Sequence, residues 1–410
     1  MELTKEQVEK IESAFKFIYT NYKEFEENSE DISFEKNEDG EYDLIHFQFP
    51  GEQEYLTMEV TEFLEIVDEI PSLRIHENYI IRTEHLGYYI VEAADQNYNY
   101  AIRNFDGYNF SSNKENIEIS LVFDNFFIGL AATTLKAYED DYWGAISPYM
   151  GIEVKYLDGN TLSQDDELKL VRSFLFEIAD STGIALTFSP IRNTSYDYEE
   201  LPDESGEYRF SKLREIEPYN EGMKLFVSAL QIQEPELRFL NFYKILEHFA
   251  PVVVNIEAHE LMRKKLDAPK KQFGDGDFIR SIFDLAKSMR AKFNDEDLIK
   301  STFACCFDFV GLFELLPNGV QTKVKKQINK QTIDYSTEKQ ALTTAANMVG
   351  KIIYATRNRV VHAKSNYETT GNECDSADLD TLNGFIKEAC SQSIRWYNRQ
   401  PQHLKLSVIQ

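Results

Sequence analysis

The sequence predicts an α+β N-terminal domain followed by an all-α C-terminal domain. In the first half, short segments rich in β-branched and aromatic residues are separated by Gly, Asn, Asp and Pro, a pattern typical of strands. In the second half strand patterns almost disappear, and apolar residues recur every three or four positions, as in helices. A polar stretch at 193–210, with Pro202 and Gly206, separates the halves. We therefore predict domains at 1–207 and 208–410.

The N-terminal domain is expected to begin with a helix within 3–27, where apolar residues keep helical spacing. A second helix is expected between Ser163, as the N-cap, and Gly183, as the stop signal. Strands are expected at 42–49, 54–60, 79–83, 87–93, 115–123 and 151–157.

The C-terminal domain is expected to be a series of helices, near 220–231, 234–250, 277–293, 295–315, 319–333, 336–362 and 377–398. Pro251 is expected to end or kink the second of these. Thr337 and Gln340 have the spacing of a capping box at the start of the sixth. Along that helix an apolar face is expected at Leu342, Ala345, Val349, Ile353 and Thr356.

The net charge of −27 is distributed very unevenly between the two halves. Residues 1–207 hold 14 Lys and Arg against 45 Asp and Glu, a net −31, whereas residues 208–410 hold 29 against 25, a net +4. Charge alone predicts that the first half repels nucleic acid and that the second half tolerates it. An acidic, well-solvated surface explains the first half equally well.

The stretch ATRNRVVHAK, residues 355–364, places polar and basic residues at the expected end of a long helix. Basic residues there interact favourably with the negative end of the helix dipole, so no function is needed to explain them. The spacing also allows a site. Asn358 and His362 are four apart and share a face, while Arg357 lies about 140° from His362 around the axis. A long guanidinium can bridge that angle, the turn can distort, or two copies can combine their residues.

These residue types suit RNA cleavage. RNA carries its own nucleophile, the 2′-hydroxyl, beside each phosphate. Histidine can move the proton near neutral pH, as acid or as base. Arginine binds phosphate oxygens bidentately, and asparagine can orient the imidazole or contact the phosphate. The candidate catalytic residues are therefore Arg357, Asn358 and His362. No metal cluster is obvious in the sequence, and we expect neither a metal nor another cofactor.

The segment YATRNRVVHA, 354–363, resembles the signature of the HEPN superfamily: Arg, a polar residue, three further residues, then His. ELRFLNFYKILEHF, 236–249, also resembles an early helix of that family, particularly in its ApeA-like branch from bacterial defence proteins. The resemblance covers about half the chain, 208–410. It implies a helical bundle that dimerises through the HEPN domain and cuts RNA without a metal, leaving a 2′,3′-cyclic phosphate and a 5′-hydroxyl.

In that family His362 would be the acid or base, Arg357 the phosphate binder and Asn358 a positioning residue. The resemblance further implies a toxin or abortive-infection effector against phage, with tRNA or other cellular RNA as its substrate. The acidic N-terminal domain would then be a sensor or restraint, and a phage protein or another trigger would act on it.

Arg359 and Lys364 flank the motif and are expected to contact the RNA backbone, although a solvated helix end is an equal alternative. Basic runs at 262–273 and 323–330 fit solvated surfaces better than RNA contacts. Glu247, on the expected early helix, is a further candidate for a residue that reaches the site. The acidic stretch 367–380 is either a loop over the site or an ordinary connection.

Two other functions remain open: a non-catalytic HEPN interaction or scaffold protein, and an acidic DNA mimic whose helical half only dimerises. The four cysteines have no zinc or C-x-x-C spacing, and no signal peptide or membrane span is visible. We expect a reduced, cytoplasmic protein.

Overall fold

The computed structural model divides the chain into two compact units, Met1–Ile216 and Glu217–Gln410. The boundary that we predict between 207 and 208 lies in 193–212, outside the described residues. The structure describes residues 3–25, 31–36, 42–93, 102, 111–114, 116–139, 144–157, 159, 161–192, 213–267, 276–292, 295–362 and 369–405, without the side chains of 111–114 and 285–292.

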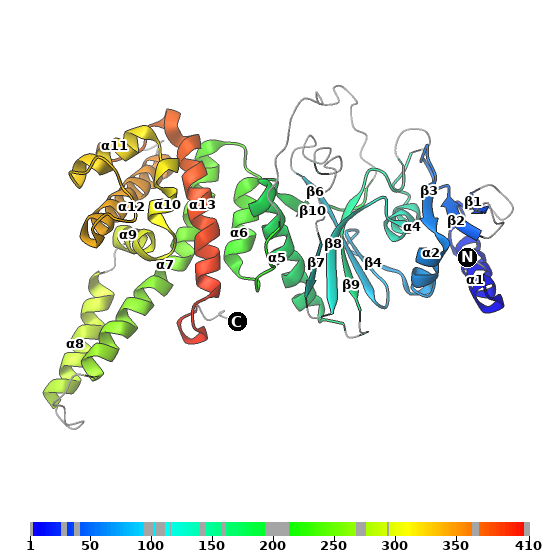
Figure 1. Ribbon diagram of the computed structural model, residues 1–410, viewed down its shortest axis with the longest axis horizontal. Coiled ribbons are helices and arrows are strands. Elements are labelled where there is room, and N and C mark those ends of the chain that lie inside the picture. Colours follow the sequence, from blue (N-terminus) through cyan, green and yellow to red (C-terminus); the bar gives the residue numbers. More distant parts are fainter. Residues whose placement is uncertain are drawn as a thin grey trace. The chain divides into compact units, whose positions relative to one another are not determined.

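The first unit begins with helix α1 (Lys5–Asn21), which confirms the helix expected there (Figure 1). Thr4 and Gln7 form a capping box. The Gln7 amide donates to the Thr4 hydroxyl over 3.2 Å, and the Thr4 amide donates to the Gln7 side chain over 2.9 Å. Two of the free amides at the helix start are thereby satisfied.

A three-stranded antiparallel sheet follows, in the order β1 (Ile32–Lys36), β2 (Tyr42–Phe47) and β3 (Leu56–Glu59). Helix α2 (Val60–Ile66) continues directly from β3, and the short turn η1 (Ile70–Ser72) comes next. The ring of Phe47 lies 5.5 Å from that of Phe63 in α2 and 4.9 Å from that of Phe126 in α4 (Phe126–Leu135). These buried aromatic rings join the small sheet to the helices around it.

The second sheet is also antiparallel. Its order is β4 (Arg74–His76), β5 (Ile80–Arg82), β6 (Leu86–Ala93), β9 (Met150–Tyr156), β8 (Ile117–Phe123) and β7 (Ser111–Lys114), and β10 (Leu186–Phe188) pairs with β6. The six predicted strands are confirmed within two residues at each end. The sequence analysis did not predict β1, β4, β7 and β10.

Helix α5 (Gln164–Thr182) has both predicted caps: the Ser163 hydroxyl accepts from the Asp166 amide, and Gly183 has a left-handed φ of 76°. The helix also carries Glu167, whose side chain is only 1% exposed. Its carboxylate accepts hydrogen bonds from Arg82 over 2.5 Å and from Tyr89 over 2.6 Å, and from the Tyr156 hydroxyl. This network connects the helix to three strands of the larger sheet.

The second unit is mostly helical, and its described residues contain no strand. In chain order it consists of α6 (Glu221–Leu230), α7 (Pro235–Leu266), α8 (Gly276–Lys292), α9 (Asp295–Cys305), α10 (Phe309–Leu312), η2 (Phe313–Leu315), α11 (Asn318–Gln327), α12 (Lys339–His362), η3 (Ser376–Asp378), α13 (Leu379–Asn398) and η4 (Gln402–Leu404). The coarse fold prediction is therefore confirmed: helices with two sheets in the first unit, and helices in the second.

Helix α7 is the centre of the second unit, since it packs against α6, α9 and α13. It runs without a break through Pro251, so the proline does not end it as one expectation allowed. Pro251 is exposed, whereas Val252 and Val253 after it are buried, which keeps the helix attached to the core. Beyond them α7 and α8 extend away from the rest of this unit as a pair of helices (Figure 1).

Helix α12 carries the candidate motif and packs closely on α9. A Cβ placed on Gly350 would lie 2.9 Å from the Cα of Lys300 in α9, so glycine permits the close approach. Ala345, Val349, Ile353 and Thr356 are buried as predicted, and Leu342 is half-buried. The predicted capping box is wrong. The helix begins at Lys339, and the Thr337 hydroxyl accepts from the Asp334 amide, forming a turn before the helix.

Candidate active site at the end of helix α12

The last two turns of α12 hold Arg357, Asn358 and His362 on regular helix, since the helix continues to His362. The Arg357 and Asn358 side chains are half-buried, and His362 is exposed. Arg357 and His362 therefore point about 140° apart around the axis, as the spacing predicts. The motif is present at an accessible helix end, but one helix does not place its arginine directly beside its histidine.

The guanidinium of Arg357 is held by two neighbours. Its Nη1 donates to the side-chain oxygen of Asn358 over 3.1 Å. Its Cζ lies 5.6 Å from the ring centroid of Tyr243 in α7, within the range of a cation–π interaction. The Asn358 oxygen is thus already engaged with Arg357, a role that the sequence analysis did not assign to it. The side-chain amide of Asn358 can still donate to a ligand.

Tyr243 is 2% exposed, and its hydroxyl has no hydrogen-bond partner among the residues that the structure describes. Burial raises the pKa of Tyr243 well above its ordinary value, Glu247 raises it further, and Arg357 opposes the rise. Tyr354 and Asp295 also raise this pKa, so groups from α7, α9 and α12 act on one hydroxyl. The phenol is therefore neutral at physiological pH.

The opposite side of α12 faces the segment after the motif. The Cys374 amide donates to the Thr356 hydroxyl over 2.9 Å. The pKa of Cys374 is raised to about 11, mainly by burial, although the nearby Arg359 cation acts in the opposite direction. Arg359 has a buried Nη2 without a partner among the described residues, so that nitrogen is not available to RNA in this conformation. Lys364, the other predicted RNA contact, lies outside the described residues.

Among the remaining sequence candidates, two lysines of the basic run at 323–330 are used within the fold. Lys323 donates to the Gly371 carbonyl over 3.4 Å, and Lys325 lies 5.4 Å above the Phe313 ring. Glu247 is exposed on α7, one turn beyond Tyr243. Part of the run at 262–273 lies outside the described residues. The described residues of 367–380 include the segment around Cys374, which is attached to α12 through Thr356.

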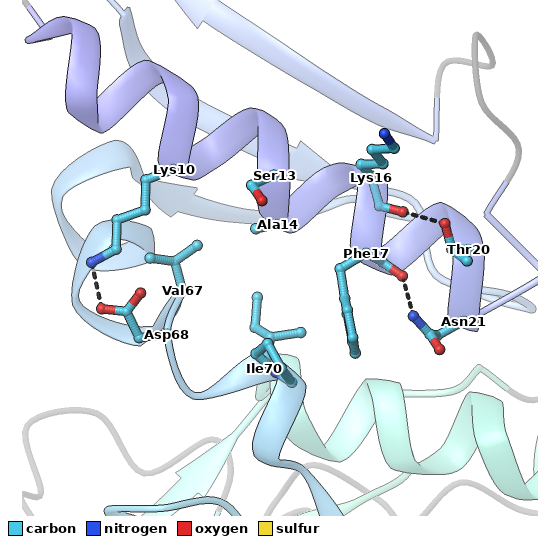
Figure 2. A pocket seen from close by; sticks show the side chains of 11 residues that line it. Lys10, Ser13, Ala14, Lys16, Phe17, Thr20, Asn21, Val67, Asp68 and Ile70 are labelled. Carbon is cyan, nitrogen blue, oxygen red and sulfur yellow. Dashed lines mark hydrogen bonds and ion pairs between the residues drawn. The ribbon is translucent and has the colours of Figure 1, made fainter.

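The first unit has a separate open pocket of about 410 Å³ between α1 and the chain that follows α2. Its apolar floor includes Phe17, Val67 and Ile70, and Lys10 pairs with Asp68 at one end (Figure 2). The polar groups that Figure 2 joins by dashed lines bond to one another or to the backbone of α1.

Neither a metal site nor a membrane span is found in the described part of the chain. No three His, Cys, Asp or Glu residues there are grouped so that they can hold a metal ion. None of the helices there is both long and apolar enough to cross a membrane. No family model matches the chain, and no curated protein or solved structure matches it either.

Proposed function

We propose that the protein is a metal-independent endoribonuclease whose site is the end of α12, with Arg357, Asn358 and His362 in the roles that the HEPN resemblance implies. The observation that carries the proposal is the arginine itself. Its guanidinium is already oriented by Asn358 and Tyr243, and it lies little more than one turn before an exposed histidine. A fixed cation on the same helix end as a histidine, which can act as an acid or a base, suits phosphate chemistry.

The reaction follows from these groups. A histidine takes the proton of the 2′-hydroxyl, the 2′-oxygen attacks the phosphorus, and the bond from phosphorus to the 5′-oxygen breaks. A second proton donor protonates the leaving 5′-oxygen. Arginine neutralises charge on the phosphate oxygens as it develops. The products are a 2′,3′-cyclic phosphate and a 5′-hydroxyl.

Two copies of the chain supply these groups more readily than one. The motif has a single histidine, and it points about 140° away from its own arginine. We propose that two α12 ends combine across a two-fold axis, so that His362 of one copy serves a phosphate held by Arg357 of the other. The protein is then a homodimer through its helical unit.

The acidic first half is proposed to restrain the nuclease until a trigger, such as a phage protein, acts on it. Its net charge of −31 repels RNA, whereas the helical half is close to neutral. Such a protein fits an abortive-infection or toxin effector in the cytoplasm, with tRNA or other cellular RNA as substrate. Deleting 1–207 is expected to increase RNA cleavage or toxicity, and unchanged or lower activity argues against restraint.

The decisive experiment incubates the purified full-length protein with total bacterial RNA in EDTA, beside Arg357→Ala and His362→Ala. His259→Ala is the matched control, because His259 is an exposed histidine of the same unit, away from the motif. The same set is also prepared as residues 208–410, without the proposed restraint. There we expect cleavage by the wild type and the control alone, with cyclic-phosphate ends. If His362→Ala changes neither RNA integrity nor toxicity in cells, the domain is instead a non-catalytic interaction module.

A further inference from the structure

The contact between Arg357 and Tyr243 joins a surface cation to the interior of the helical unit. Tyr243 belongs to α7, the helix that packs against α6, α9 and α13, so its ring is fixed by the core. Arg357 is half-buried at the end of α12. The Cζ of Arg357 lies over the Tyr243 ring, 5.6 Å from its centroid, within the range of a cation–π interaction.

The environment of Tyr243 differs from that of an ordinary core tyrosine. A buried phenol normally finds a hydrogen-bond partner, but this hydroxyl has none among the described residues. Within the described part of the chain the hydroxyl therefore adds no hydrogen bond, and the aromatic ring is the part that touches a functional group. Phe242, the preceding residue, is equally buried, but its ring lies 5.8 Å from Phe226, away from the motif.

We infer that Tyr243 is a positioning residue: together with the side-chain oxygen of Asn358, its ring holds the Arg357 guanidinium in one orientation, with the remaining N–H groups turned outward to receive a phosphate. The catalytic consequence rests on the ribonuclease activity proposed above, whereas the contact itself does not. An arginine side chain has four rotatable bonds, and a guanidinium that is held before binding loses less freedom when the phosphate arrives. Tyr243 acts through Arg357 and does not touch the RNA.

The first test replaces the ring. Tyr243→Leu removes the aromatic face, and Tyr243→Met does so with a flexible side chain that fills the gap if the leucine variant does not fold. A fall of about five- to thirtyfold in kcat/KM is expected from the lost cation–π contact. Tyr243→Phe keeps the aromatic face and is expected to keep most of the wild-type kcat/KM. Phe242→Leu is the control for the loss of a buried ring from the same turn of α7.

The second test observes the contact without any activity. Full-length protein labelled with ¹⁵N-arginine gives an Nε–Hε signal for Arg357, assigned by its absence in Arg357→Ala. The aromatic ring current displaces this signal in the wild type. We expect the displacement to persist in Tyr243→Phe and Phe242→Leu, and to disappear in Tyr243→Leu or Tyr243→Met while the thermal unfolding transition remains cooperative.

The outcomes separate the two proposals. If neither the full-length protein nor residues 208–410 alone cleave RNA, but the full-length protein shows the ring-current displacement, the ribonuclease is refuted and the positioning contact stands. An Arg357 signal that is the same with and without the ring overturns the inference. The inference also fails if Tyr243→Phe loses as much activity as Tyr243→Leu, because the hydroxyl would then be the important group.

Discussion

Replacing Arg82 with Met tests whether the buried carboxylate of Glu167 organises the first unit. Glu167 is 1% exposed and accepts from Arg82 over 2.5 Å, from Tyr89 over 2.6 Å, and from Tyr156. Methionine keeps much of the apolar stem of arginine but provides neither its charge nor its donors. The variant therefore leaves a buried negative charge with two phenol donors and no cation.

The magnitude follows from this arrangement. Removing one partner of a buried ion pair destabilises a fold by about 3–5 kcal/mol, because the other charge remains in a low-dielectric site. Glu167→Gln is expected to destabilise the fold less, by about 1–3 kcal/mol, since it removes the charge and leaves Arg82, whose side chain is 24% exposed, in reach of water. The two variants should therefore differ although they break the same pair.

Urea unfolding followed by tryptophan fluorescence measures the difference. The chain has two tryptophans, Trp143 in the first unit and Trp396 in the second. In a Trp396→Phe background the signal reports the first unit. With an m value of about 2 kcal/mol/M, Arg82→Met is expected to lower the urea midpoint by about 1.5–2.5 M.

Lys155→Met is the matched control. Lys155 pairs with Glu65 over 3.4 Å, but their side chains are 39% and 69% exposed. A surface pair of this kind contributes less than about 1 kcal/mol, so the midpoint should fall by less than about 0.5 M. If Arg82→Met shifts the midpoint no more than this control, the buried network does not stabilise the unit as argued.

Two further predictions concern packing and pH. Gly350→Ala places a Cβ 2.9 Å from the backbone of α9 and is expected to destabilise the second unit by about 1–3 kcal/mol. Gly384→Ala, in α13, places a Cβ with no neighbour within 4 Å in the described part of the chain and should stabilise the unit by up to about 1 kcal/mol. Trp396 fluorescence during urea unfolding compares the two variants. Burial tends to raise the pKa of Glu69, but hydrogen bonds from Thr83 and His85 outweigh it, so this pKa is lowered; the hydrogen bond to Glu69 in turn raises the pKa of His85. The pair should therefore stabilise the fold at intermediate pH, losing its effect as pH falls through the lowered Glu69 pKa or rises through the raised His85 pKa. The unfolding temperature measured against pH should lose the alkaline part of this dependence in His85→Asn, and an unchanged profile contradicts the assignment.

Local signals in the sequence predicted individual elements well. Helix α5 begins after Ser163 and ends at Gly183 because a hydroxyl cap and a left-handed glycine act within a few residues. Other local signals were overridden. Thr337 has capping-box spacing, but its hydroxyl accepts from the Asp334 amide. Pro251 interrupts the hydrogen bonding of α7, but the buried valines after it hold the helix against the core.

The candidate site was only half visible in the sequence. The motif at 357–362 predicts which residues share the end of α12, because helical spacing is a local property. The contact between Arg357 and Tyr243 depends on how α7 packs near α12. It brings together residues that are more than 100 positions apart in the chain. In the sequence, Tyr243 is only one residue of the helix expected at 234–250. Long-range packing, and not the motif, identifies the partner of the arginine.

The geometry of α12 also limits where the proposed reaction can occur. Arg357 and Arg359 are two positions apart, so they point about 200° apart around the axis of α12. Arg357 contacts Tyr243, and Arg359 lies near Cys374, so protein groups already lie on both of these sides. Asn358 and His362 share the face between them. This arrangement favours a histidine that reaches the phosphate held by Arg357 from outside this helix. In the proposed homodimer, a second copy of the same helix end provides that histidine. Mixing Arg357→Ala protein with His362→Ala protein is therefore expected to restore part of the activity in mixed dimers, at one of the two composite sites. No recovery on mixing argues that each chain completes its own site.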